Sequence, residues 1–197
     1  YRQRRHATLQ ALRSTPCQCS HTGLATLGRT KADLQQYYML AHGCHLVDTA
    51  RYLCGEIIAV QARHLQRFGA YSWFVDVEFA NGALGHLDLT VAVRMDWHEG
   101  FQHYGEHASV IAKTFNPCLF RASEVHIFRE STGASSRVLG ADAHFYRRQL
   151  ESFADAVLTN GPVSGADVAD GIAAVRAMLA IGESAATGRP VNLASVS

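Results

Sequence analysis

Two segments bring together side chains that could carry acid–base chemistry. In the first, residues 37–51, His42, His45 and Asp48 recur at intervals of three. On an α-helix, residues three apart are neighbours on one face. A carboxylate one turn from an imidazole can fix the imidazole tautomer and favour its charged form, as a general acid–base pair requires. The spacing predicts such a pair, but a histidine and an aspartate that anchor the helix would explain it too.

The second segment, residues 96–107, mixes aromatic, acidic and imidazole side chains. It contains Trp97 and His98, followed by His103 and His107, at an expected strand–loop–strand junction. An aromatic wall with several hydrogen-bonding groups suits a pocket for a sugar or polyol. A solvated sheet end with one buried tryptophan would account for the same composition.

The cysteines offer a third interpretation, metal binding, which is the weakest. Cys17 and Cys19 form a C-x-C pair with no second pair at zinc-finger spacing. On a regular helix Cys44 points away from His42 and His45, so we assign no metal ligand. Five cysteines are an odd number in a chain large enough to fold without disulfides, and no signal peptide is visible. We therefore expect reduced thiols and a cytoplasmic location.

The elements that must position these residues follow from the hydrophobic pattern. Apolar residues at three- and four-residue steps predict a helix over 31–54, and alternation around Asn81-Gly82 predicts a hairpin. Strands grouped in the middle of the chain, with helices before and after, predict an α+β fold: an open, mainly antiparallel sheet with helices packed on one face. The expected segments are a short basic helix over 2–13, a loop over 14–30, strands over 56–66, 70–80, 83–94, 100–113, 125–129, 137–139 and 191–193, and helices over 144–159 and 167–187.

Composition and missing motifs exclude several function classes. With 48% hydrophobic and 18% charged residues, the chain can bury a core and is not disordered. A formal charge of +1 gives no case for nucleic acid, and no apolar run reaches the length of a membrane span. The sequence holds no G-x-G-x-x-G or P-loop to cradle phosphate. It also lacks the G-x-S-x-G and H-E-x-x-H motifs of serine hydrolases and zincins.

Four stretches resemble one family when they are taken in order. His42-Gly-Cys-His-Leu-Val-Asp48, followed by Tyr52-Leu-Cys-Gly55, resembles the G-x-H-x-x-D…L-x-G helix of the Gfo/Idh/MocA oxidoreductases, which include inositol dehydrogenase. Residues 77–85, residues 104–110, and residues 149–155 together with 184–191 agree in the same order. The resemblance covers residues 31–193 and concerns the C-terminal domain of that family.

The resemblance implies hydride transfer between NAD or NADP and a carbon of a sugar, polyol or related hydroxy compound. It implies that His45 is the active-site histidine, which assists proton transfer at the reacting hydroxyl. We expect His42, Trp97 and His98 to line the substrate pocket. Where the family often has an aspartate, four residues before that histidine, this chain has Ala41. Either His42 takes over part of the role, or the proton relay differs, or activity is lost.

The resemblance also predicts the organisation of the protein. We expect residues 1–30 to form a seam helix and an irregular loop, and residues 31–197 to form the α+β domain. The family's N-terminal Rossmann domain, with its catalytic lysine, is missing from this sequence. We therefore expect this chain alone to bind no cofactor and to be inactive. The expected partners are that domain and a second copy of the chain bound through a sheet face. The alternative is a catalytically inactive, standalone dimerisation or ligand-binding module.

Overall fold

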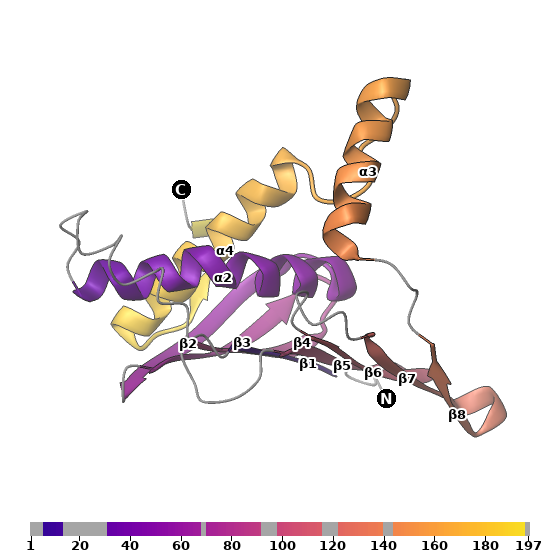
Figure 1. The fold of residues 1–197 in the computed structure, drawn as a ribbon. Coiled ribbons are helices and arrows are strands. Elements are labelled where there is room, and N and C mark those ends of the chain that lie inside the picture. Colours follow the sequence, from indigo (N-terminus) through magenta and orange to yellow (C-terminus); the bar gives the residue numbers. More distant parts are fainter. Residues whose placement is uncertain are drawn as a thin grey trace.

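A computed structural model describes residues 6–13, 31–67, 70–91, 98–115, 122–139 and 144–195 (Figure 1). The described strands form one open nine-stranded sheet in the order β8-β7-β6-β5-β1-β4-β3-β2-β9. The strands are β1 (His6–Arg13), β2 (Ile57–Arg67), β3 (Ala70–Phe79), β4 (Leu84–Val91), β5 (His98–Tyr104), β6 (Ala108–Phe115), β7 (Glu124–Arg129), β8 (Ala134–Val138) and β9 (Val191–Asn192). The helices are α2 (Lys31–Cys54), α3 (Phe145–Thr159) and α4 (Val168–Thr187), with short 3₁₀ turns η2 (Glu130–Thr132) and η3 (Leu193–Ser195).

The sheet confirms the predicted fold class. Every neighbouring pair of described strands is antiparallel except β1 and β4, which run parallel. Helices α2 and α4 lie side by side on one face of the sheet (Figure 1). Helix α2 packs on β4 and β1, and α4 packs on β2 and β9. Strand β9 pairs only with β2, so the predicted edge strand is also confirmed.

The prediction of a helix over residues 2–13 is wrong for the part that the structure describes. Residues His6–Arg13 are a strand, β1, which lies between β4 and β5. Its register runs from His6 opposite Leu84 to Arg13 opposite Val91. Both edges of β1 thus find hydrogen-bonding partners far along the chain, and such long-range pairing overrides local helix propensity.

The predicted strand over residues 100–113 is in fact two strands. Strands β5 and β6 are joined by a turn at residues 105–107, closed by the Gly105 N–H donating to the Ala108 carbonyl at 2.9 Å. The hairpin predicted at Asn81-Gly82 is present, with Gly82 at φ +82°. The Asn81 amide donates to the Cys54 carbonyl at 2.8 Å. The hairpin therefore also holds the C-terminal end of α2.

Alternation along the strands places one set of side chains under the helices. In β3 and β4 the buried core residues include Tyr71, Trp73, Val75, Val77, Phe79, Leu87 and Leu89. From the helices they include Met39, Leu46, Val47, Ala50, Ala174, Ala177, Met178 and Ile181. Burying one such aliphatic side chain contributes about 1.5–3 kcal/mol. Inside α2, a Cβ at Gly43 would lie 2.8 Å from the sulfur of Met39. Glycine at this position leaves room for Met39 to enter the core.

Ser184 of α4 makes the polar link between helix and sheet. Its side chain is fully buried, and its oxygen accepts the Ala62 N–H at 2.9 Å and donates to the Arg189 carbonyl at 2.6 Å. We expect Ser184→Ala to lower the free energy of unfolding by about 2 kcal/mol, because it leaves both groups without their partner. Urea denaturation measures the change. Ser135→Ala, at an exposed position of β8, is the control, and an equal shift in both variants would contradict the assignment.

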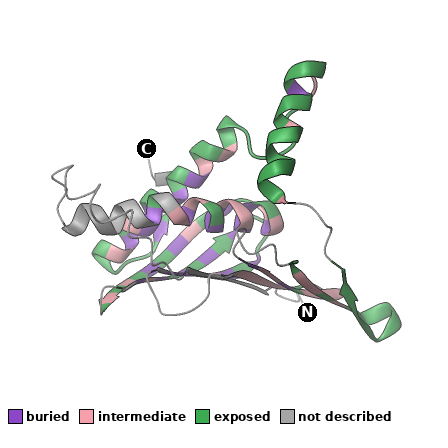
Figure 2. Ribbon diagram, in the orientation of Figure 1, coloured by how far each residue is buried: buried purple, intermediate pink, exposed green. Residues whose placement is uncertain are grey.

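Helix α3 stands away from the layered part of the molecule (Figure 1). Figure 2 shows it exposed over nearly its whole surface, and of its residues only Ala156 is buried. The apolar stripe formed by Tyr146, Leu150, Phe153 and Val157 is 51–70% exposed. Within the described residues, none of the helices combines the length and apolarity needed to cross a membrane.

Candidate active site

Helix α2 carries the first group of candidate residues on one continuous helix. His42 is half-buried and His45 is exposed, and Asp48 follows after three more residues. At 3.6 residues per turn, each step of three shifts the side chain by about 60° around the helix. The helical geometry predicted from the spacing is therefore present. His45, the predicted catalytic residue, is accessible from outside the domain.

Asp48 interacts with a different residue from the histidine with which its spacing predicts a pair. Its carboxylate accepts from Nη1 of Arg51 at 3.4 Å. Within the part of the chain that the structure describes, Asp48 is paired with this guanidinium and not with His45. Asp48 therefore helps to hold the helix, which is the second explanation that the spacing allowed.

Arg51 is the buried centre of an ion cluster at the C-terminal end of α2, and the carboxylates around it are partly exposed. Only 7% of its side chain is exposed. Its Nε and Nη2 donate to the two carboxylate oxygens of Glu56 at 3.0 and 2.7 Å. Nη2 also donates to the Asp170 carboxylate at 3.2 Å, and Nη1 donates to the Asp170 carbonyl at 3.1 Å. The cluster joins the end of α2, the residue before β2 and the first turn of α4.

The electrostatics of this cluster favour its charged forms. The hydrogen bond to Glu56 is the main cause that raises the pKa of Arg51. The pKa of Asp170 is lowered, first by the hydrogen bond from the Asp167 backbone N–H and further by Arg51. Asp167 and Asp170 also form the capping box of α4. The cluster ties the C-terminal part of α2, the helix that carries His45, to the start of β2 and of α4.

The second group of candidate residues is only partly covered by the structure. Trp97 lies outside the described residues, and His98 begins β5 with a side chain that is not described. Further along β5, Phe101 packs against the core, and Nδ1 of His103 lies 3.9 Å from Sγ of Cys54. Residue His103 of the predicted pocket segment, residues 96–107, therefore contacts the C-terminal end of α2.

Cys54 is not a candidate nucleophile. Burial raises the pKa of its thiol, which keeps the sulfur protonated and weakly reactive. Its contact with His103 packs helix against strand. Within the described residues no group of three histidine, cysteine, aspartate or glutamate side chains could hold a metal ion.

His42 and His45 lie on the flank of α2 that faces away from α4. Leu40 lines a cavity together with residues of α4, and Arg51 bonds to Asp170, so these side chains mark the α4 flank. His42 lies roughly 200° around the helix from Leu40. We call this flank of α2, which carries the half-buried His42 and the exposed His45, the shelf. The shelf offers two imidazoles for proton transfer and hydrogen bonds.

Comparison with known proteins relates the chain to an oxidoreductase family. Residues 38–193 match the family model Gfo/Idh/MocA C, described as the oxidoreductase family's C-terminal alpha/beta domain. Among curated proteins, none matches the chain significantly.

Three solved structures illustrate the likeness in fold. Levoglucosan dehydrogenase in complex with NADH is 20% identical, with a TM-score of 0.73 over 97% of this chain and 59% of that one. An oxidoreductase from Thermotoga maritima is 18% identical, with a TM-score of 0.70 over 98% of this chain and 54% of that one. A protein from Sinorhizobium meliloti, provisionally described as a myo-inositol dehydrogenase, is 18% identical, with a TM-score of 0.65 over 95% of this chain and 56% of that one. The chain thus spans less than three fifths of the length of each.

Proposed function

The chain belongs to the Gfo/Idh/MocA oxidoreductase family through its C-terminal alpha/beta domain, and we propose that it is the substrate-binding and oligomerisation domain of an NAD- or NADP-dependent oxidoreductase acting on a sugar, a polyol or a related hydroxy compound. The observation that carries the proposal is the shelf, where α2 presents His45 and His42 on the flank that faces away from α4. Complexes of levoglucosan dehydrogenase with NADH, alone and with L-sorbose, support the compound class.

We propose that the dinucleotide binds mainly outside this domain. Its described strands include one parallel pair, β1 and β4, and the sequence has no glycine-rich turn between a strand and a helix. NAD or NADP would be held by another domain of a longer enzyme, and it would accept the hydride there. The part left to this domain is to bind the substrate and to move a proton.

His45 is the proton acceptor in this proposal. Oxidation of an alcohol removes a hydride from carbon and a proton from the hydroxyl oxygen, and an accessible imidazole at the shelf can take that proton. Ala41 removes the carboxylate that the family often has one turn earlier. We propose that His42 supplies the second hydrogen bond to the substrate, with Trp97 and His98 completing the pocket wall.

Ala41 also favours a second function, that of a ligand-binding module without catalysis. One experiment separates the two. The longest natural protein that contains this chain is incubated with NAD⁺ or NADP⁺ and with levoglucosan, L-sorbose or myo-inositol, and absorbance at 340 nm is followed. Reduction of the nucleotide supports the oxidoreductase. Substrate binding seen by calorimetry without any reduction would support the binding module and overturn the first proposal.

We propose that a second copy of the chain binds to the outer sheet face, the one without helices. This face carries apolar side chains that are between 37% and 50% exposed: Leu65, Phe74, Leu84, Tyr104, Ile111 and Phe128. Among them lie the Phe74–His86 ring stack and a hydrogen bond of 2.8 Å between His86 and Asp76. Exposed apolar patches of this kind mark association surfaces.

Phe74→Glu tests the outer face as the interface. We expect this variant to sediment as a monomer at concentrations at which the unaltered chain is a dimer, because a carboxylate in the centre of an apolar interface loses its hydration. The control is Leu158→Glu on α3, where Leu158 is 82% exposed and lies outside this face. A dimer that survives Phe74→Glu but dissociates with Leu158→Glu would place the interface on α3.

A further inference from the structure

The apolar face of α3 is not covered by another element. Tyr146, Leu150, Phe153 and Val157 recur at steps of four, three and four residues, which places them on one face of the helix, and each is more than half exposed. Among the described elements, none packs extensively against α3. A helix of 15 residues is marginal in water unless its apolar face packs against a partner. This face, the α3 stripe, therefore marks a surface that requires a partner.

The stripe belongs to a larger surface at the C-terminal end of α2. In the connection between α3 and α4, the Ser164 hydroxyl is hydrogen-bonded to the Ser152 hydroxyl of α3. Further along this connection, Ala166 lines a cavity together with Tyr52, which is 88% exposed near the end of α2. Val168, the first residue of α4, is 80% exposed. We call Tyr52, Val168 and the α3 stripe together the α3 surface.

The α3 surface is large enough to form an interface between two domains. Six side chains contribute to it, and three of them, Tyr52, Tyr146 and Phe153, are aromatic. Complete burial of one aromatic side chain removes about 150–250 Å² from water. Interfaces between domains of one chain bury about 600–1,500 Å², so the exposed area of these six side chains is of that order. Single apolar residues scattered over a surface need no explanation, whereas a group of this size marks an association surface.

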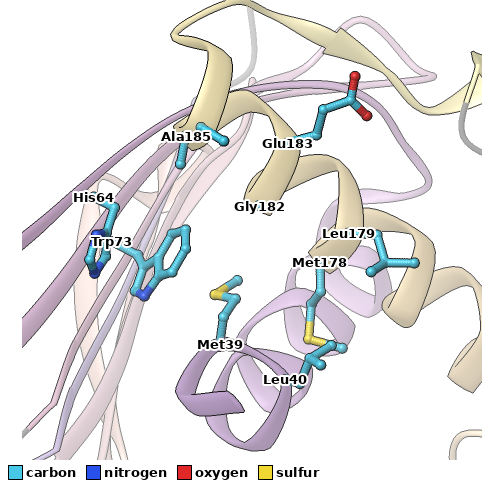
Figure 3. A pocket seen from close by; sticks show the side chains of 10 residues that line it. Met39, Leu40, His64, Trp73, Met178, Leu179, Gly182, Glu183 and Ala185 are labelled. Carbon is cyan, nitrogen blue, oxygen red and sulfur yellow. The ribbon is translucent and has the colours of Figure 1, made fainter. Parts of the chain in front are cut away.

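The cavity between α2 and α4 is a separate feature (Figure 3). It is lined by residues that include Met39, Leu179 and the cross-strand pair His64 and Trp73. Met39 precedes Tyr52 by 13 residues in α2, which is about 20 Å along the helix axis. The cavity therefore lies toward the opposite end of α2 and is not part of the α3 surface.

A segment that precedes β1 would enter the fold next to the α3 surface. His6, where β1 begins, lies opposite Leu84 of β4. Leu84 follows the hairpin at Asn81, and the Asn81 amide donates to the carbonyl of Cys54, the last residue of α2. Tyr52 comes two residues before Cys54. The start of β1 and the α3 surface thus lie at the same end of α2, so a domain joined ahead of β1 would emerge beside that surface.

We propose that the α3 surface docks the domain that holds the dinucleotide, and that this domain precedes β1 in a longer chain. The inference rests on the proposed oxidoreductase function, in which the dinucleotide binds outside this domain. The match spans less than three fifths of each solved relative, so more than two fifths of each lies outside it. Tyr52 follows His45 by seven residues, about 10 Å along the helix axis, so the docked domain adjoins the shelf.

Hydrogen exchange of the α3 amides tests the docking. It is measured by mass spectrometry on this chain alone and on the longest natural protein that contains it. We expect the amides of residues 149–159 to exchange at least about tenfold more slowly in the longer protein, because an opening that frees the helix must then also break the interface. Residues 134–138 of β8, which are exposed at the edge of the sheet, are the internal reference and should exchange alike in both proteins.

Two glutamate substitutions on α3 show whether the stripe itself makes the contact. Leu150 and Arg148 are both exposed, and Arg148 lies roughly 200° around the helix from Leu150. In the longer protein, Leu150→Glu should return the exchange of α3 to the rate of the chain alone, because a carboxylate in an apolar interface loses its hydration. Arg148→Glu places the same side chain on the opposite face and should keep the protection.

The possible results separate the docking from the enzymatic function. Equal exchange of α3 in both proteins, or full protection in Leu150→Glu, would overturn the proposal, and so would a gene that encodes no domain ahead of β1. Protection that appears in the chain alone as its concentration rises would assign the surface to a second copy and contradict the proposal. Protection without reduction of NAD⁺ or NADP⁺ would contradict the oxidoreductase function and support the docking. Reduction without protection would contradict the docking alone.

Discussion

Replacing His45 by alanine is expected to lower kcat of the enzyme that contains this domain by about 10²–10⁴-fold, the usual contribution of a general acid–base group. His45 is exposed on α2 and lies on the flank that faces away from α4. Without its imidazole, the hydroxyl proton loses the acceptor assigned to it in the proposal, while the carbon loses its hydride. KM should change much less than kcat, since His42 and the pocket wall remain to bind the substrate. Steady-state reduction of NAD⁺ or NADP⁺ measures both constants.

His126→Ala is the matched control for this prediction. His126 is exposed on β7, and its neighbour across the sheet is Ile111, which lies on the outer face. The control should keep kcat. If both variants lose activity equally, the loss reflects damage to the domain. If His45→Ala retains full activity, His45 does not act as the proton acceptor.

Arg51→Ala is expected to lower the free energy of unfolding by about 2 kcal/mol, because it removes a buried guanidinium that donates hydrogen bonds to carboxylates and to a backbone carbonyl. The substitution leaves the carbonyl of Asp170 without its donor and breaks both hydrogen bonds to Glu56. Three elements meet at this guanidinium, so its loss should also loosen the contact between α2 and α4. Guanidinium chloride denaturation measures the change.

Two further variants separate the causes of this loss. Arg51→Lys keeps the charge but cannot bind Glu56 with a two-pronged donor, so its stability should lie between those of the unaltered chain and Arg51→Ala. Arg147→Ala removes an exposed ion pair with Glu151 on α3 and should leave the stability unchanged. A similar loss from Arg51→Ala and Arg147→Ala would mean that the cluster around Arg51 contributes nothing beyond a surface pair.

Local signals were sufficient for much of the fold. Apolar residues along one face predicted α2, and Asn81-Gly82 predicted the β3–β4 hairpin, because both depend on neighbouring residues alone. Strand β1 could not be predicted this way. Its short sequence between arginines suggested a helix, whereas its pairing with β4 and β5 makes it a strand. The turn that divides β5 from β6 was missed because apolar–polar alternation continues on both sides of Gly105.

For the candidate site too, the positions of the residues along the helix could be predicted, but their partners could not. The three-residue steps placed His42, His45 and Asp48 along α2, but the partner of Asp48 is Arg51. Arg51 lies 119 residues before Asp170, and nothing in the local sequence links the two. The pairing of His64 with Trp73 was equally hidden, because it requires the register of β2 against β3. Most of the features that could not be predicted are therefore contacts between elements that lie far apart in the sequence.

The place of β1 has a consequence for how the sheet assembles. β1 comes before all the other described strands in the chain, yet its partners β4 and β5 begin only at Leu84 and His98. Contacts of such high sequence separation form slowly, so the blocks β2–β4 and β5–β8 are expected to fold first and to be joined late. Until then each block exposes an unpaired edge, which is a template for aggregation. Removing residues 6–13 should therefore cause aggregation in refolding experiments, rather than a modest loss of stability.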